Sequence, residues 1–270
     1  MKSKGIAIPY VVWMAIFVVA PLILVVVYAF TDRSGSFTTE NFSSMFQYAT
    51  VFGRSFLLAF IATVICILLG YPMAYFLARE RGRLRHMATM LIMLPMWMNF
   101  LLRTYSWVFL LERNGFFNTL LETIGLPKLD IIDTQGAVVL GMVYNFLPFM
   151  VLPIFSVIEK LDHRLIEAAQ DLGANSTQVF RRVIFPLSLP GVLSGVTMVF
   201  IPSVSTFVIS RLLGGSKSLL LGDLIEMQFL GSAYNPYLGS AISLVMMIIV
   251  LVCMGIMNRF GEGEGEAVVL

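Results

Sequence analysis

Charged residues are scarce in this chain of 270 residues, because only 13% are Asp, Glu, Lys or Arg while 58% are hydrophobic. Soluble domains typically carry about 25% charged residues. A chain with about half that share cannot cover a water-exposed surface, which excludes a soluble enzyme, a disordered protein and a disulfide scaffold. The net charge of +2 is too small for a surface that binds nucleic-acid phosphates, so we expect no nucleic-acid partner.

Acidic residues are absent from the longest apolar runs of the sequence. Six runs are long enough to cross a bilayer as helices, which takes roughly 20 mostly apolar residues each. They are 7–30, 56–78, 87–111, 136–158, 190–210 and 238–257. We therefore predict an all-α polytopic membrane protein with six transmembrane helices.

The only charged residue in these six runs is Arg103. We expect it near the outer interface, where its side chain either reaches the lipid headgroups or faces a pore. Carriers driven by protons or sodium commonly hold the ion on intramembrane carboxylates or on unwound backbone. The first kind of site is missing here, while prolines within several runs leave the second kind open.

Motifs for nucleotide binding and catalysis are also missing. The sequence contains no G-x-x-x-x-G-K-[ST], no H-E-x-x-H and no G-x-S-x-G. We therefore expect neither an ATP site nor an enzyme. Cys66 and Cys253 each lie alone in a predicted span, so we expect no metal site.

Basic residues in the loops predict the orientation of the chain. The loop 79–86 is short and carries four arginines, and short basic loops face the cytoplasm. With six spans, both termini then face the cytoplasm as well. That side collects most of the 18 Lys and Arg residues.

The predicted cytoplasmic loop 159–189 is too long to be structureless. Its apolar stripe of Leu165, Ala168, Ala169 and Leu172 predicts a short amphipathic helix, and Gly173 predicts the end of that helix. A second short helix follows, with Asn175 or Ser176 as its first cap and Pro186 as its end. Such a pair of helices either rests on lipid headgroups or docks a cytoplasmic partner.

This loop resembles the EAA motif of ABC importer permeases. The matching residues are Glu167, Ala168, Ala169, Asp171 and Gly173, followed by Val183-Ile184-Phe185-Pro186. Val183 and Phe185 are mild departures from the aliphatic residues of the motif. The resemblance implies the type I importer permease fold, with segment 167–186 as the element that couples the membrane domain to an ATPase.

The resemblance also implies a set of partners in a bacterial plasma membrane. These are a cytoplasmic ABC ATPase dimer, a second permease subunit and an extracytoplasmic substrate-binding protein. ATP and Mg²⁺ would be bound by the ATPase, and this chain would bind no cofactor. We expect one permease domain over 1–260 and a flexible, solvated tail over 261–270, which is rich in Gly and Glu.

Further segments resemble polyamine (spermidine/putrescine) permeases. They include Gly70-Tyr71-Pro72, Leu94-Pro95-Met96-Trp97, Leu102-Arg103-Thr104-Tyr105 and Leu147-Pro148-Phe149. A polyammonium substrate calls for aromatic faces and hydrogen-bond acceptors along its path. The candidates are Trp97, Asn99, Tyr105, Tyr144 and Asn145.

The outer side carries charges of both signs. Acidic residues there could concentrate cations at the mouth of a path: Glu112, Glu122, Asp130, Asp133, Asp223 and Glu226. Arg211 stands where some relatives have an acidic residue, which weakens the polyamine assignment. We expect segment 216–230 to form an interfacial or re-entrant helix, because it is apolar but short.

Three alternatives remain at the level of the sequence. The same class of permease can carry iron, sulfate or another small solute. An ion-coupled secondary carrier would need no ATPase, and a membrane receptor or scaffold would move no solute. The EAA-type loop favours the importer, because the other two classes have no need for that spacing.

Overall fold

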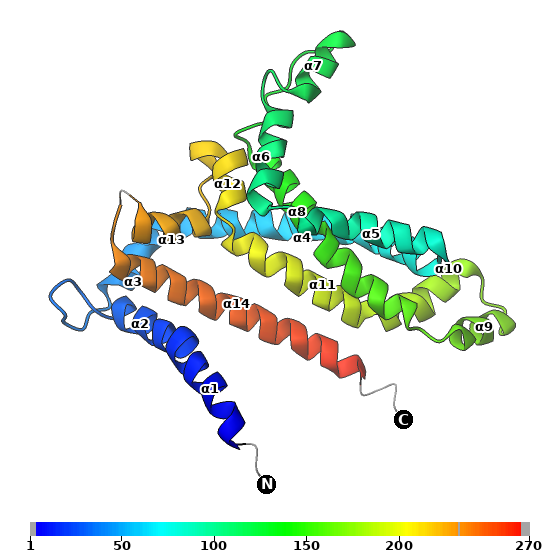
Figure 1. Ribbon diagram of the computed structural model, residues 1–270, viewed down its shortest axis with the longest axis horizontal. Helices are drawn as coiled ribbons and strands as arrows, with labels where there is room; N and C mark the ends of the chain where they lie inside the picture. The colour runs from blue at the N-terminus through cyan, green and yellow to red at the C-terminus, as the bar shows by residue number, and fades with distance from the viewer. Residues whose placement is uncertain (1–3, 232, 266–270) are drawn as a thin grey trace.

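The computed structural model describes residues 4–231 and 233–265, and every regular element in these residues is helical (Figure 1). η1 and η3 are π-helices, and η2 and η4 are 3₁₀-helices. The bounds are α1 Lys4–Met14, η1 Ala15–Val19, α2 Ala20–Ala29, α3 Glu40–Met45, η2 Phe46–Tyr48, α4 Ala49–Arg79, α5 Arg83–Trp97, α6 Phe100–Leu111, α7 Phe116–Thr123, α8 Gln135–Glu159, α9 His163–Asp171, α10 Ser176–Val179, η3 Phe180–Ile184, α11 Phe185–Ser205, α12 Val208–Leu213, η4 Gly215–Ser218, α13 Leu221–Leu230 and α14 Pro236–Gly265.

Five helical stretches of the described residues are long and apolar enough to cross a membrane. They are Ile8–Ala29, Glu40–Arg79, Gln135–Glu159, Ser176–Ser205 and Pro236–Met257. A bent helix pair gives a sixth if the pair is counted as one span. The predicted all-α membrane fold is confirmed.

The third predicted span, 87–111, is not one straight helix. α5 ends at Trp97 and α6 begins at Phe100, and the stretch Phe100–Thr123, which holds α6 and α7, is bent by 94° from the direction of α5. Pro95 has no N–H for the last turn of α5, and Asn99 caps the new helix by accepting hydrogen bonds from the backbone of Leu101 and Leu102. α6 and α7 therefore project away from the bundle (Figure 1).

The fifth predicted span also has different limits. Helix runs without interruption from Ser176 through η3 to Ser205, so Pro186 does not end a helix as the sequence suggested. The Phe185 N–H donates to Phe180 O, five residues back, and shifts the bonding register before the proline. Pro186 then lies in the first turn of α11, where a missing N–H costs little.

The centre of the fold is the contact of α8 with α4 and α11. Met150 of α8 is fully buried between Gly70 of α4 and Gly195 of α11. A Cβ added at Gly70 would lie 2.9 Å from Met150 Cγ, and one at Gly195 would lie 2.7 Å from its sulfur. One turn away, a Cβ at Gly191 would lie 2.9 Å from Pro153 O of α8. These glycines allow the helix backbones to approach closely, as small residues do in membrane proteins.

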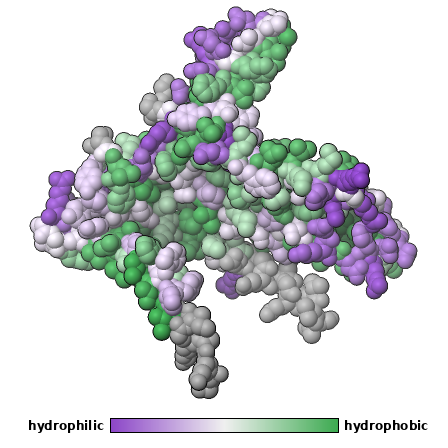
Figure 2. Space-filling model, viewed as in Figure 1, coloured by the Kyte–Doolittle hydropathy of each residue, from purple (hydrophilic) through white to green (hydrophobic). Residues whose placement is uncertain are grey.

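The connecting elements separate to two ends of the bundle (Figure 1). At one end, α9 and α10 lie beside the ends of α4 and α8, and Figure 2 shows polar side chains gathered there. At the other end, α13 packs on α4, since the Leu221 N–H donates to Ser55 Oγ at 2.8 Å. The rings of Tyr28 and Tyr237 meet at the same end, with centroids 5.6 Å apart.

Two further expectations concern short segments. The segment 216–230 contains η4 and the short helix α13, as expected for an element that does not span the membrane. α14 continues to Gly265, so the first half of the tail expected to be flexible is helical, and residues 266–270 lie outside the described residues.

The close packing of α11 on α8 predicts that Gly191 tolerates no large side chain. Gly191→Leu forces the helices apart against the Pro153 carbonyl, and such overpacking costs about 1–3 kcal/mol. We expect a clear fall in the thermal unfolding temperature of the detergent-solubilised protein. Gly255→Leu is the matched control, because no atom lies within 4 Å of a Cβ there. Equal unfolding temperatures for the two variants would contradict this packing.

Candidate coupling loop and substrate path

We call the loop 159–189 the coupling loop, after the role predicted for it. Its first helix is fixed at both ends by its own sequence. Asp162 begins α9 by accepting a hydrogen bond from the Arg164 N–H at 3.0 Å. Gly173 ends it with a φ of +83°, a conformation that side chains resist. The N–H groups of Gly173 and Ala174 donate back into the last turn of α9, at 2.8 and 3.0 Å. This is a complete Schellman cap, and it confirms the predicted helix end.

The second helix of the loop begins with a capping box. Asn175 Oδ1 accepts from the Gln178 N–H, and Gln178 Oε1 accepts from the Asn175 N–H, both at 2.9 Å. This reciprocal pair satisfies two backbone donors that the helix start leaves free. The predicted cap at Asn175 is confirmed, so the turn between α9 and α10 has a defined shape.

The apolar stripe of α9 divides between two faces. Ala169, with neighbouring Ile166, packs against the hydrophobic core. Leu165, Ala168 and Leu172 point to solvent, and the side chain of Leu172 is 90% exposed. We call these three residues the outward face of α9. An exposed apolar face on an otherwise capped helix is a surface for contact with another body.

Two carboxylates lie beside the outward face of α9. Glu167 and Asp171 are both exposed. Within the described part of the chain, neither side chain has a hydrogen bond or an ion pair. Their charges are therefore open to a basic partner from outside the chain. Pro186, the last residue of the predicted motif, lies beyond α10 and η3, in the first turn of α11.

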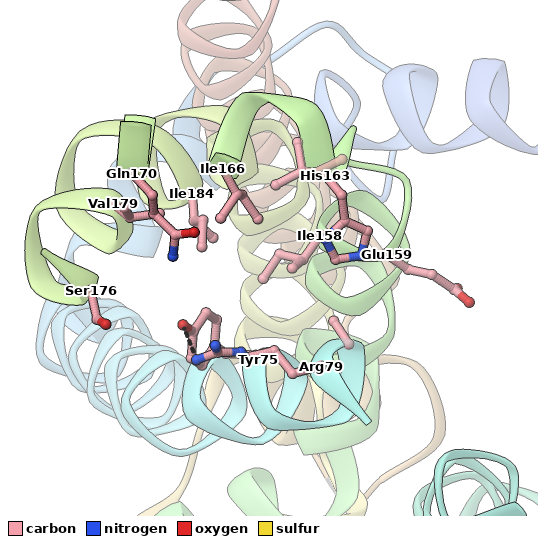
Figure 3. Close-up of a pocket in the computed structure, with 12 residues that line it drawn as sticks. Tyr75, Arg79, Ile158, Glu159, His163, Ile166, Gln170, Ser176, Val179 and Ile184 are labelled. Atoms are coloured by element: carbon pink, nitrogen blue, oxygen red, sulfur yellow. Dashed lines mark hydrogen bonds between the residues drawn. The ribbon is translucent and has the colours of Figure 1, made fainter. Parts of the chain in front are cut away.

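A small pocket lies between the coupling loop and the body of the protein (Figure 3). Its volume is about 130 Å³, and α4, α8, α9 and α10 all contribute to its walls. Tyr75 and Arg79 come from the end of α4, and Arg79 donates a hydrogen bond to the Tyr75 hydroxyl at 2.9 Å. Gln170 and Ser176 face them from the loop. The pocket therefore separates the loop from the end of α4 near Arg79.

Three of the predicted path residues lie at or near the break between α5 and α6. Trp97 ends α5 and is 81% exposed, and Tyr105 is 45% exposed one turn into α6. Asn99 is exposed between the two helices, where its Oδ1 accepts the two capping hydrogen bonds of α6. Trp97, Asn99 and Tyr105 are therefore all exposed at or near the break.

The other two predicted path residues lie on α8 and are less accessible. The ring of Tyr144 is half-buried against Trp107, with centroids 5.2 Å apart. Asn145 is fully buried, and its Nδ2 donates to Gly141 O at 2.8 Å. Its side chain faces the interior of this chain, so the structure does not bring it together with Trp97.

Arg103 takes a place that the sequence did not predict. It neither reaches the headgroups nor faces open space, because it is only 5% exposed. Its Nη1 donates to Pro95 O at 2.5 Å, and its Cζ lies 5.9 Å from the ring centroids of Phe100 and Tyr144. The guanidinium therefore bridges the break and pairs with the carbonyl end of α5, which carries partial negative charge.

Arg211 is neutralised by two carboxylates of α13. It donates a bidentate pair of hydrogen bonds to Glu226, and its Nε lies 3.7 Å from Asp223 Oδ1. The hydrogen bonds from Arg211 lower the pKa of Glu226, whereas burial raises the pKa of Asp223. Asp223 also accepts from Ser210 Oγ at 2.5 Å.

These ion pairs correct the expectation that the outer acidic residues concentrate cations at the mouth of a path, because most of these residues are already paired with basic side chains. Besides the two carboxylates of α13, Glu122 lies 3.3 Å from Lys128 and Asp130 lies 3.7 Å from Arg113. Paired charges partly cancel beyond their immediate surroundings, so most of the predicted acidic set adds little field at the mouth.

Sequence reasoning missed an aromatic cluster beside the coupling loop. Phe180, the first residue of η3, contacts Tyr71 and Tyr75 of α4. The hydroxyl of Tyr71 is 2.8 Å from Ser188 Oγ of α11, and both groups are buried. The spacing of Tyr71 and Tyr75 places both on one face of a helix, but the sequence gives no sign of the partner ring.

Comparison with known proteins gives one family over most of the chain. The family model described as "Binding-protein-dependent transport system inner membrane component" matches residues 67–262. The spermidine/putrescine transport system permease protein PotB of Haemophilus influenzae is 41% identical over 247 residues, covering 88% of this chain and 86% of that protein. PotB of Escherichia coli K12 is 38% identical over 247 residues, covering 88% and 90%.

Solved structures have the same fold at low sequence identity. A bacterial ABC transporter involved in the import of the acidic polysaccharide alginate matches with a TM-score of 0.78 and 19% identity, over 96% of this chain and 94% of that chain. The MetNI methionine ABC transporter, in an inward-facing conformation, matches with a TM-score of 0.62 and 16% identity, over 82% and 97%. The chain therefore belongs to the binding-protein-dependent transport system inner membrane components, the permeases of ABC transporters.

Proposed function

We propose that this chain is a permease subunit of a polyamine importer and forms half of the path for spermidine or putrescine. The observation that carries the proposal is the 38–41% identity to PotB permeases over about nine-tenths of the chain. The chain contributes a path and a coupling surface rather than a reactive centre. Its permease domain extends over 1–260, and the chain is not an enzyme.

The proposed assembly contains a cytoplasmic ATPase dimer, a second permease and an external binding protein. The alginate transporter, which has the same fold, has been solved together with a periplasmic binding protein. ATP and Mg²⁺ would be held by the ATPase subunits. A different second permease would complete the path, so that this chain carries only part of the selectivity.

The coupling loop carries the proposed contact with the ATPase. Closure of an ATPase dimer on ATP would move the outward face of α9, formed by Leu165, Ala168 and Leu172. Glu167 and Asp171 would meet basic residues of the partner at the edge of that face. The two caps of the turn keep α9 and α10 in a fixed relation, so that a push on α9 moves the loop as one body.

The distribution of basic residues supports an orientation with this loop in the cytoplasm. The ends of α4 and α8 meet the loop around one pocket, and the basic loop 79–86 follows α4 at that end. Short basic loops are retained on the cytoplasmic side. With six spans, both termini of this bacterial plasma-membrane protein then face the cytoplasm.

The proposed path runs past the break between α5 and α6. Trp97 and Tyr105 offer exposed rings, and a cation over such a ring gains roughly 0.5–2 kcal/mol. Asn99 fixes the start of α6 between them in the sequence, because its Oδ1 accepts the two capping hydrogen bonds. Tyr144 lies next to the break through Arg103, whose Cζ is 5.9 Å from its ring centroid, and Asn145 serves the packing of α8 instead of the path. Pairing of Arg211 with Glu226 removes the repulsion that a free cation would exert on a polyamine.

Uptake by the reconstituted complex tests the proposed function. The complex purified from its membrane, in liposomes with ATP inside, is expected to import radiolabelled spermidine or putrescine when its binding protein is present outside. Transport that persists with ATP after an ionophore collapses ion gradients supports the importer. ATP-dependent uptake of iron or sulfate but not polyamines would overturn the substrate, and ATP-independent uptake would favour an ion-coupled carrier.

We predict that Gly173→Asp lowers uptake at least tenfold, which corresponds to ~1.4 kcal/mol, without unfolding the membrane domain. No atom lies within 4 Å of a Cβ at this position, so the side chain fits, but the new carboxylate stands at the C-terminal end of α9, where the helix carbonyls carry partial negative charge, and it weakens the cap that fixes the turn between α9 and α10. Gly173→Asn is the matched control, because Asn has the same size, tolerates positive φ and adds no charge. Wild-type uptake by the Asp variant would refute the coupling role.

We predict that Trp97→Leu raises the KM for spermidine uptake by about 2–30-fold, the range that corresponds to the loss of one cation–aromatic contact. Trp97→Phe retains a ring and should have a smaller effect. Trp13→Leu is the control, since Trp13 is an exposed indole on α1, far along the chain from the break. An unchanged KM in Trp97→Leu would remove this residue from the path.

A further inference from the structure

Four aromatic rings connect the coupling loop to α4. Tyr71 and Tyr75 stand one turn apart on α4, Phe180 is the first residue of the π-helix η3, and Phe185 directly follows η3. The ring centroid of Phe180 lies 5.3 Å from that of Tyr75 and 5.8 Å from that of Tyr71, with near-perpendicular ring planes. Phe185 lies 5.7 Å from Tyr71. We call these four residues the aromatic joint.

The aromatic joint adjoins the pocket of the coupling loop through Tyr75. Tyr75 lines the pocket on the α4 side, while Val179, the neighbour of Phe180, lines it on the loop side (Figure 3). Beyond Tyr75, toward the end of α4, the pocket separates Arg79 from the loop residues Gln170 and Ser176. A displacement of the loop toward α4 therefore meets resistance first at the rings of the joint.

The aromatic joint lies at the π-helix η3, where the hydrogen-bonding register of the helix can change. A π-helix has i→i+5 hydrogen bonds, and such turns are frequent at functional sites. Here the Phe185 N–H donates to Phe180 O, so the two phenylalanines of the joint close the π-turn themselves. A return of this turn to α-helical bonding would rotate α10 against α11 and move the Phe180 ring relative to α4.

We propose that Phe180 is a positioning residue for transport, whose ring, held by Tyr71 and Tyr75, transmits the movement of the coupling loop to α4. This inference rests on the proposed coupling role of the loop and extends it to a path through the membrane domain. α4 in turn packs on α8 at Gly70 and Met150, so a displaced α4 acts on the centre of the bundle.

The number of spermidine molecules transported per ATP hydrolysed tests this role in the reconstituted complex. Phe180→Leu is expected to lower that ratio at least fivefold, while the amount of ATPase subunit that co-purifies stays unchanged. Phe200→Leu is the matched control. Phe200 of α11 contacts Phe56 of α4, with ring centroids 6.2 Å apart, so it joins the same two helices away from the coupling loop. Its ratio should stay within twofold of wild type.

Variants at Tyr75 test the same joint independently, in case Phe180→Leu fails to fold. Tyr75→Leu removes one ring of the joint from the surface of α4 and should lower the ratio as well. Tyr75→Phe keeps the ring, loses only the hydrogen bond from Arg79, and should keep the ratio near wild type.

Two outcomes would overturn the proposed role of Phe180. One is that Phe180→Leu and Phe200→Leu transport the same number of spermidine molecules per ATP hydrolysed. The other is a loss of the ATPase subunit from Phe180→Leu, because Phe180 would then support the docking surface rather than transmit movement. Failure of the wild-type complex to contain any ATPase would instead overturn the proposed function itself.

Discussion

The close approach of α8 to α4 and α11 is the constraint on which the rest of the structure depends. Met150 fills the space that Gly70 and Gly195 leave open, and no larger residues fit at those glycines without moving a helix. Lipid tails are as apolar as side chains, so backbone proximity and packing must hold these helices together. Because α8 leads into the coupling loop and α11 leads out of it, this contact also fixes the base of the loop.

Rigidity is distributed unevenly between this centre and the end of the bundle that carries the loop. The loop has a Schellman cap at Gly173 and a capping box at Asn175, which define the turn between its helices. A pocket separates part of it from α4, and the aromatic joint connects the two on the side of the membrane domain. A rigid loop that contacts α4 through the aromatic joint is suited to transmit a movement generated by another subunit.

Local signals in the sequence predicted local structure well and tertiary structure poorly. Gly173 and Asn175 act on their own backbone, so their roles could be predicted from residue type and spacing. Pro186 was assigned to a helix end because a shift to π-helical bonding cannot be read from the sequence. Arg103 was misplaced and Arg211 was counted as an unpaired cation for a related reason. Their partners, Pro95 O and Glu226, are brought near by the bend between α5 and α6 and by the packing of α13.

Cross-linking from the outward face of α9 tests the central claim most directly. Leu172→Cys, at a side chain that is 90% exposed, is expected to form a covalent adduct with the co-purified ATPase subunit when a short bifunctional thiol reagent is added. Ile166→Cys, on the inward face of the same helix, should give little adduct, and Leu230→Cys, exposed on α13 at the other end of the bundle, should give none. No adduct from Leu172→Cys, or an ATPase adduct from Leu230→Cys, would contradict the account.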